Sequence, residues 1–413
     1  MKFSIAKTCI NPLIPSYLSG QINRIEKHTG ILDDLFCTTI IIEENQTKIC
    51  LLAYDLLQFD SSLSDAIRIK VADKLNIDTR NVFTIPSHTH AAPEVLKDGL
   101  FGIKTESSVA EGYLDYLTNK SIDNSVLANE TLKNVDLEYG EIEIDGIYGN
   151  RNDKNRLADK KIRFLMFKDK NKVVGILVNL SCHPTILGAK NTMISADLFG
   201  YIRSHLEDRY HCPVFMSNGT EGDVSNRHYR ISDDINELIR TGNGIISQIP
   251  YPLPTSLVSI NRFEIHHRSF EFKCFNDIIR LRDAISRNNQ LILDTNNPDQ
   301  LKILHATNTV LNHQINQTYH ERLTIEYSII ELGSMIIITV PLELFSSLYL
   351  KLEYHNTIIF GLTNTSYGYC VDKESYDNTY EGLTSLFIKG EGERFISHLN
   401  EEIKQIQRIN ASI

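Results

Sequence analysis

The first residues that could do chemistry are two histidines separated by a single threonine. His88 and His90 follow a short hydrophobic run and precede Ala91-Ala92-Pro93, small residues that leave space around the imidazoles. In extended backbone, residues two apart point to the same side, so both rings can face one cavity. One ring could then hold a metal ion while the other transfers protons. A histidine pair with only a structural role is the alternative.

His183 is a third candidate, in the segment SCHPT (181–185) at the end of a predicted strand. Downstream, Ser195-Ala196-Asp197 is typical of a helix start, with Ser195 as the cap and Asp197 in the first turn. Alternatively, the Asp197 carboxylate could accept a hydrogen bond from a histidine and fix its tautomer. Both interpretations remain open at this point.

A turn of small residues, 219–225, follows another predicted strand and ends at Ser225. It could present the Ser225 hydroxyl and backbone N–H groups to a substrate, as nucleophile elbows do, although it departs from the G-x-S-x-G pattern. A plain turn is the alternative. Glu343 follows Pro341-Leu342 and is predicted to open a helix, where the helix dipole stabilises an acidic residue. Tyr380 lies in a polar segment and carries no signal of its own.

These residues must be positioned by a chain that mixes strands and helices. Apolar runs around short polar turns predict hairpins at 38–42/48–53 and 162–167/173–180, and apolar residues at i, i+4 spacing predict a helix over 61–75. The pattern predicts an α/β fold, or an α+β one, of mixed sheets flanked by helices. The other predicted helical segments are 198–209, 276–321, 343–354 and 392–409, and the other predicted strands are 82–85, 213–216, 257–272, 323–332, 335–340 and 358–362.

Composition excludes several classes of protein. The chain has 413 residues, 42% of them hydrophobic and 23% charged, which are ordinary globular values and not those of a disordered or coiled-coil chain. A net charge of -10 without any Lys/Arg-rich block argues against nucleic-acid binding. No apolar run approaches the ~18 residues of a transmembrane helix. The glycine patterns that cradle phosphates in NTPases and dinucleotide-binding enzymes are missing from the sequence.

The N-terminus and the cysteines predict a cytoplasmic protein. Lys7 interrupts any apolar stretch, and Pro12 and Pro15 follow soon after it, unlike a secretory signal. The seven cysteines are an odd number without a C-x-x-C pair, which favours reduced thiols over a disulfide framework. We therefore expect a cytoplasmic location.

The candidate residues lie in short segments whose order along the chain is more informative than any one of them. The segments are AKTCINP (6–12), ILDDL (31–35), YDLL (54–57), SHTHAAP (87–93), GNR (149–151), CHPT (182–185), ISAD (194–197), GY (200–201), EGDVS (221–225), PLE (341–343), GLTN (361–364) and YDNTYEG (376–382). In this order they resemble the neutral/alkaline non-lysosomal ceramidase family. The resemblance implies one catalytic unit over residues 1–413, similar to the family's N-terminal catalytic domain without its C-terminal β-sandwich.

The resemblance also implies a zinc centre. His88, His183, Glu343 and Tyr380 fall at the positions where the family holds a catalytic zinc ion. Two imidazoles, a carboxylate and a phenolate form a donor set that suits zinc and leaves a position for water. Zinc lowers the pKa of bound water to ~7, which makes hydroxide available at neutral pH.

Roles for further residues follow from the same resemblance. His90 is expected to move protons or polarise the carbonyl, and Arg151 to position the substrate oxygen. Ser225 matches the serine of the family's Gly-Asp-x-Ser segment and is expected to contact the carbonyl or the oxyanion formed from it. Asp197 or Asp223 is expected to hold the ligands or the catalytic side chains in place through a hydrogen bond.

The surrounding segments depart from the family pattern. After His90 the chain has AAPE in place of Ser-Gly-Pro-Gly-Gly, Asn226 replaces a proline, and Asn152-Asp153 replace Ser-Pro. We therefore expect a zinc-dependent hydrolase that cleaves a linear amide of a small N-acyl molecule, less readily an ester, in a pocket altered from that of ceramidases. One alternative is an amidase or esterase with Ser225 as nucleophile and the metal as electrophile. The other is a non-catalytic protein that binds a lipid or glycan on the same fold.

Overall fold

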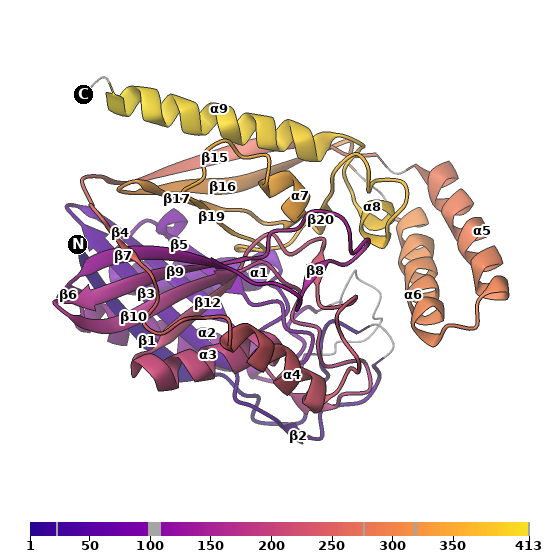
Figure 1. Ribbon diagram of the computed structural model, residues 1–413, viewed down its shortest axis with the longest axis horizontal. Coiled ribbons are helices and arrows are strands. Elements are labelled where there is room, and N and C mark those ends of the chain that lie inside the picture. The colour runs from indigo at the N-terminus through magenta and orange to yellow at the C-terminus, as the bar shows by residue number, and fades with distance from the viewer. Residues whose placement is uncertain (22–23, 98–108, 276, 318–319, 412–413) are drawn as a thin grey trace.

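Two five-stranded sheets, each with parallel and antiparallel pairs, pack face to face (Figure 1). The computed structural model describes residues 1–21, 24–97, 109–275, 277–317 and 320–411. The first sheet contains, in order, β5 (Val82–Pro86), β4 (Thr47–Tyr54), β3 (Phe36–Glu44), β1 (Lys2–Cys9) and β6 (Lys133–Asn134). The second contains β12 (Val214–Asn218), β10 (Lys172–Leu180), β9 (Lys161–Asp169), β7 (Asp136–Glu143) and β14 (Ser256–Val258).

A continuous apolar core joins these sheets to a third one. Phe3 of β1 stacks on Phe167 of β9, with ring centroids 3.7 Å apart, so the first two sheets are in direct contact. The third sheet contains, in order, β15 (Phe263–Lys273), β16 (Arg322–Leu332), β17 (Met335–Thr339) and β19 (Thr357–Phe360). Phe360 of β19 lies against Phe215 of β12 at 6.5 Å between centroids, which connects the third sheet to the second.

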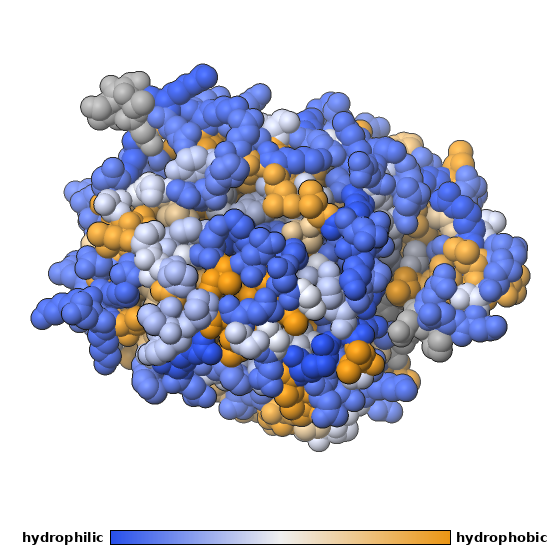
Figure 2. Space-filling model, in the orientation of Figure 1, coloured by the Kyte–Doolittle hydropathy of each residue, from blue (hydrophilic) through white to orange (hydrophobic). Residues whose placement is uncertain are grey.

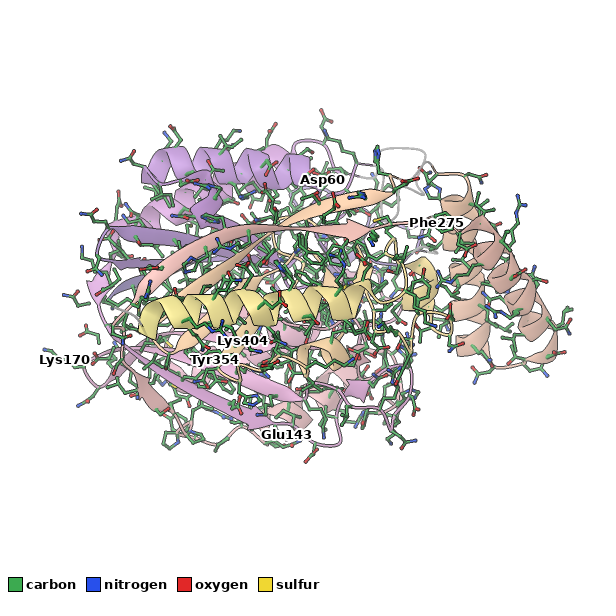
Figure 3. The ribbon with its side chains drawn as sticks, turned by 90° about the horizontal axis from the view of Figure 1, so that it is seen from above. Asp60, Glu143, Lys170, Phe275, Tyr354 and Lys404 are labelled. Atoms are coloured by element: carbon green, nitrogen blue, oxygen red, sulfur yellow. The ribbon has the colours of Figure 1, made fainter. Side chains whose placement is uncertain are left out.

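Helices cover the outer face of each sheet. The helix α1 (Ser61–Leu75) turns Leu63, Ile67 and Val71 inward, and together with α2 (Tyr113–Glu130) it covers the first sheet. The helices α3 (Asp197–Tyr210) and α4 (Ile235–Ile246) cover the second sheet. The long helix α9 (Glu391–Ala411) lies along the third sheet, as Figure 3 shows from above, where Lys404 marks it.

The predicted α/β architecture and both predicted hairpins are confirmed, with one correction along the chain. The strand predicted at 257–272 is divided between β14 and β15, which belong to different sheets. The helical segment predicted at 276–321 is confirmed as two helices, α5 (Ile278–Asp294) and α6 (Pro298–Ile315), which end before β16 begins at Arg322; residues 276, 318 and 319 lie outside the described residues. These two helices project to one side of the sheets (Figure 1).

Two-residue strands and short helices tie the loops together at one end of the sheets. They are β2 (Gly30–Ile31) with β11 (Met193–Ile194), β8 (Gly149–Asn150) with β13 (Val224–Ser225), β18 (Glu343–Leu344) with β20 (Tyr369–Cys370), α7 (Ser346–Tyr349) and α8 (Tyr380–Thr384). The 3-10 turn η1 (Thr79–Asn81) directly precedes β5 and lies at the opposite end of that strand from His88. All seven cysteines are free thiols. Among the described residues, every helix is too short or too polar to cross a bilayer. The face seen in Figure 2 is mostly hydrophilic, with apolar side chains in small groups.

Candidate metal centre

The candidate residues follow strands that run parallel to a neighbour. β5 pairs in parallel with β4, β10 with β12, and β17 with β19. His88 comes shortly after β5, His183 shortly after β10, and Glu343 shortly after β17. The carboxyl ends of parallel strands are where open α/β sheets commonly bind ligands. One residue from the end of each of the three sheets is therefore brought to the same place.

His88 reaches the site through a left-handed turn. We expected extended backbone at His88 and His90, but β5 ends at Pro86 and His88 has a φ of 72°. Positive φ is uncommon for a residue other than glycine and is found where surrounding contacts hold the backbone in place. The His88 N–H donates to the Leu56 carbonyl at 2.9 Å, which is one such contact. Both rings nevertheless line the predicted common cavity.

The tautomers of three imidazoles are set by the backbone. In each ring Nδ1 lies 2.8 Å from a carbonyl oxygen, which can only accept, so Nδ1 carries the proton and Nε2 keeps its lone pair. This is the arrangement that leaves Nε2 able to bind a metal or accept a proton. The pairs are His88 with Leu57, His90 with Gly20, and His183 with Glu221.

Glu343 is held by a strand, and the helix predicted to begin there is wrong. β18 pairs in parallel with β20, and the Glu343 N–H donates to the Gly368 carbonyl at 3.0 Å. These bonds take the backbone groups that a helix would have used, so the helix begins only at Ser346. Gly222 packs against this segment, where a Cβ would come within 2.6 Å of the Glu343 carbonyl oxygen.

Three of the four predicted ligands form a buried cluster. Oε2 of Glu343 lies 3.2 Å from Nε2 of His183 and 3.5 Å from Nε2 of His88. One donor atom from each of these three residues lies within 4.8 Å of the others. Burial alone would raise the pKa of the Glu343 carboxyl, but His88 and His183 outweigh it and hold that pKa well below its usual value. The centre therefore combines two imidazole lone pairs with a carboxylate.

Burial favours the neutral form of two of these imidazoles, those of His183 and His90. It lowers the pKa of His183 to about 4, with the nearby Arg151 charge adding to the effect. The pKa of His90 also falls well below its usual value, through burial and then through His88 and His183. The His90 ring lies 5.0 Å from that of His88, and its Nε2 is buried without a hydrogen-bond partner among the residues that the structure describes. A buried nitrogen of this kind is suited to a substrate or a water molecule.

Arg151 is brought beside the cluster by the short strands. Asn150 pairs with Val224 in the β8–β13 ladder, and the Arg151 N–H donates to the Asp223 carbonyl at 2.7 Å. Its Nε lies 2.7 Å from Oε1 of Glu381, in an ion pair that is almost fully buried. Burial lowers the pKa of the Arg151 guanidinium, but the Glu381 carboxylate outweighs it and raises that pKa above its usual value.

Two residues of this site are additions to the sequence prediction. Tyr369 faces Glu343 across the β18–β20 pair, and its ring stacks 6.4 Å from that of His183 and 5.4 Å from the Arg151 guanidinium carbon. Nothing in its sequence surroundings separates it from the other tyrosines. Glu381 could have been found, because it lies in the segment YEG next to the predicted ligand Tyr380.

Ser225 and Asp223 lie on the same turn in different roles. The Ser225 hydroxyl oxygen accepts from the Arg227 N–H at 3.2 Å and lines the cavity. Within the described parts of the chain, neither a histidine nor a carboxylate is hydrogen-bonded to that oxygen. The Asp223 carboxylate accepts from the Ser346 N–H at 2.6 Å and from the Asn150 amide at 3.0 Å. It therefore ties the segments that carry Glu343 and Arg151 to its own turn.

Tyr380 opens α8 and lines the same cavity as the three clustered ligands. Burial, followed by the Glu343 charge, raises the pKa of its hydroxyl above the usual value. That hydroxyl has no hydrogen-bond partner among the residues that the structure describes. Release of its proton therefore requires a nearby cation, as the predicted ligand role does.

Asp197 supports the loop that follows His183 and touches no histidine. Its carboxylate accepts from the N–H groups of Ile186 and Leu187, at 3.2 and 3.0 Å, and from the N–H of Leu198. The Ser195 hydroxyl accepts from the Asp197 N–H at 2.9 Å, as a capping group would, although the residue at the cap position is Ala196. The predicted helix start and the first-turn position of Asp197 are confirmed, but the predicted cap, Ser195, is wrong by one residue.

The cluster opens into a cavity of about 210 Å³. Its walls contain all seven of the residues singled out for metal binding and catalysis. They are His88, His90, Arg151, His183, Ser225, Glu343 and Tyr380. Further walls come from the loop at Gly20, from the turn after Ser225, from the loop after His183, from Tyr369 and from α6.

Comparisons with known proteins agree with this geometry. Residues 12–221 match the sequence profile described as neutral/alkaline non-lysosomal ceramidase, N-terminal. The neutral ceramidase of Pseudomonas aeruginosa has a similar structure, with a TM-score of 0.71 and 16% identity over 96% of this chain and 73% of that one. A structure described as ceramidase complexed with C2 has a TM-score of 0.71 and 15% identity, over 97% and 74% of the two chains. Comparison with curated protein sequences gives no match. Because the family profile covers half of its length, the chain belongs to the neutral/alkaline non-lysosomal ceramidase family.

Proposed function

We propose that the chain is a zinc-dependent hydrolase that cleaves a linear amide bond. Its family and fold support amide hydrolysis. The observation that carries the metal assignment is the buried group of His88, His183 and Glu343, whose donor atoms lie within 4.8 Å of one another. The donor types fit zinc, and the two Nδ1–H groups are occupied by carbonyls, which leaves both Nε2 atoms for the metal. Tyr380 is proposed as the fourth ligand.

Zinc bound here supplies a Lewis acid and makes hydroxide available near neutral pH. The chain's own groups then handle the proton and the carbonyl. Neutral His90 can take the proton of the attacking water at Nε2 and return it to the nitrogen of the breaking C–N bond, so that the products are a carboxylic acid and an amine. The Arg151 guanidinium and the Ser225 hydroxyl are proposed to orient the carbonyl oxygen and stabilise its developing charge. Asp223 accepts hydrogen bonds from Asn150 and Ser346 and so holds the segments that carry Arg151 and Glu343 together.

The proposed substrate is a small N-acyl molecule, as in ceramidases, and the proposed catalytic unit is the whole of residues 1–413. Three of the candidate ligands follow strands of the three sheets and the fourth opens α8, which supports a single unit. The alternative with Ser225 as a covalent nucleophile has less support, because its hydroxyl accepts only from the Arg227 N–H among the described residues.

The test compares metal content with activity. Purified protein is analysed for zinc and assayed on a panel of N-acyl amides, with His183→Ala as the variant and His355→Ala as the control, because His355 is exposed and lies outside this cavity. We expect about one zinc per chain, lost together with amide hydrolysis in His183→Ala only. If His183→Ala loses neither, the proposal is wrong. An acyl-enzyme trapped on Ser225 would favour the serine mechanism, and tight zinc binding without any turnover would favour a binding protein.

A further inference from the structure

Basic side chains outnumber acidic ones in the lining of the cavity beside the metal centre. Four basic side chains line it, and Glu343 is the one carboxylate among its lining residues in the described part of the chain. The basic residues are Arg151, Arg227, Arg230 and Lys302. This concentration of positive charge stands out in a protein whose net charge is -10. A cleft with low-dielectric walls focuses such charge onto whatever enters it.

Two of these residues are presented by one tight turn after Ser225. The N–H groups of Tyr229 and Arg230 both donate to the Asn226 carbonyl, at 2.7 and 2.9 Å, and close the turn 226–230. Arg227 and Arg230 both line the cavity from this turn. Asn226 itself stands where the family pattern has proline, so this is a part of the pocket in which the chain departs from the family.

Arg151 and Arg227 differ in how their charges are compensated. The Arg151 guanidinium lies 2.7 Å from Glu381, so its charge is balanced within the protein. Arg227 is partly buried and donates through Nη1 to the Arg151 carbonyl at 3.3 Å, and it forms no ion pair with any of the described carboxylates. Burial, followed by the neighbouring Arg151 charge, lowers the pKa of Arg227 to about 10, although the Glu381 carboxylate opposes this shift. An anion placed in the cavity would relieve both effects.

We infer that the substrate is an N-acyl amide that carries an anionic group, a carboxylate or a phosphate, and that Arg227 binds this group. The inference rests on the proposed amide hydrolysis and names its substrate class. Arginine presents paired N–H donors that match the two oxygens of a carboxylate or a phosphate. Arg230 and Lys302, on the same walls, add to the positive potential. Ceramide itself is neutral, so the inference separates this chain from enzymes selective for ceramide.

The test compares amides that differ only in charge. N-dodecanoylglycine is compared with the neutral N-dodecanoylglycinamide, and N-dodecanoylethanolamine with its phosphate monoester, by kcat/KM on the zinc-loaded enzyme. We expect at least one anionic member to exceed its neutral partner by about 10- to 100-fold, the contribution of a hydrogen-bonded charge pair. The two pairs distinguish a carboxylate from a phosphate substrate. Equal or reversed ratios in both pairs would overturn the inference.

Variants then assign the selectivity to Arg227. Arg227→Met should remove the preference mainly through KM, and Arg227→Lys should restore part of it. Arg282→Met is the control, because it removes an exposed arginine on α5 outside the cavity and should leave the ratio unchanged. If Arg227→Met slows anionic and neutral amides equally, its role is structural and the inference is wrong. A separate readout is calorimetric binding of N-dodecanoylglycine and of the phosphate monoester to zinc-loaded His90→Ala. If either ligand binds in an Arg227-dependent way while the wild type hydrolyses no amide, the proposed amide hydrolysis is wrong and the anion-binding role of Arg227 stands.

Discussion

The contact between Gly20 and His90 gives a sharp test of the proposed division of roles. Gly20 has a φ of +86°, and a Cβ on it would lie 2.4 Å from Cγ of His90. Its carbonyl also accepts the His90 Nδ1–H at 2.8 Å. Gly20→Ala should therefore disturb the proposed proton-transfer residue, while His88, His183 and Glu343 keep their own contacts.

The size of the effect follows from these distances. An ordinary contact begins at about 3.4 Å, so the imidazole must move by about 1 Å, and a displacement of that size can cost roughly 100-fold in rate. Alanine at positive φ adds about 1–2 kcal/mol of backbone strain, which for a chain of this length is a fall in Tm of roughly 1–2 °C. Gly146→Ala is the matched control, because Gly146 has a φ of +73° with nothing within 4 Å of its Cβ position.

Three measurements on the two variants decide the outcome. Tm is expected to fall by a similar small amount in both, and zinc content is expected to stay at the wild-type value in both. The kcat on the best amide substrate is expected to fall by roughly 100-fold in Gly20→Ala only. Wild-type kcat in Gly20→Ala would refute the role of His90, and loss of zinc in that variant would show that His90 belongs to the metal centre.

Three further predictions concern the proposed ligand Glu343, the buried carboxyl of Asp197 and the buried ion pair of Arg203 with Asp55. Glu343→Gln removes the anionic donor, so zinc measured after dialysis should fall well below one per chain; full occupancy would contradict the ligand assignment. Burial raises the pKa of Asp197 from 3.8 to about 6. The folded chain therefore binds this proton more tightly than the unfolded one, and the free energy of unfolding should fall by up to ~3 kcal/mol as pH rises from about 4 to about 6. In denaturant titrations, the free energy of unfolding of Asp197→Asn should fall less than that of the wild type over this pH range. An equal fall in both proteins would count against this prediction. Arg203 Nη1 lies 2.6 and 2.8 Å from the two carboxylate oxygens of Asp55, so Arg203→Met leaves Asp55 buried without its ion-pair partner. The free energy of unfolding, measured by chemical denaturation, should fall by about 3–5 kcal/mol, and most of this loss should be regained in Asp55→Leu/Arg203→Met.

The sequence was a good guide where local pattern decides the structure. The helix at 61–75 was predicted with its full length from apolar spacing alone, because that spacing acts within one segment, and the structure adds the cap at Asp60. His88 and His183 could be singled out because strand ends and small neighbours are visible locally. The order of the segments, compared with the family, then linked residues that lie far apart in the chain.

The remaining features depend on contacts between distant segments. Glu343 was expected in a helix because nothing nearby reveals its pairing with β20, which supplies the competing hydrogen bonds. The positive φ of His88 is imposed by surrounding structure and has no signature in its neighbours. Tyr369 becomes part of the site only through that same β18–β20 pairing. The role proposed for Arg227 depends on its place beside Arg151, which forms the ion pair with Glu381 while Arg227 forms none with the described carboxylates.

The separation of the clustered ligands along the chain has a consequence for synthesis. His183 and Glu343 are 160 residues apart. At about 5–20 residues per second, Glu343 leaves the ribosome roughly 8–30 s after His183. During that interval the two histidines are present without their carboxylate partner, and the third sheet is still incomplete, because β15, β16 and β17 precede Glu343 and β19 follows it. The centre proposed to bind zinc can therefore be completed only late in translation, after the first two sheets have had time to form.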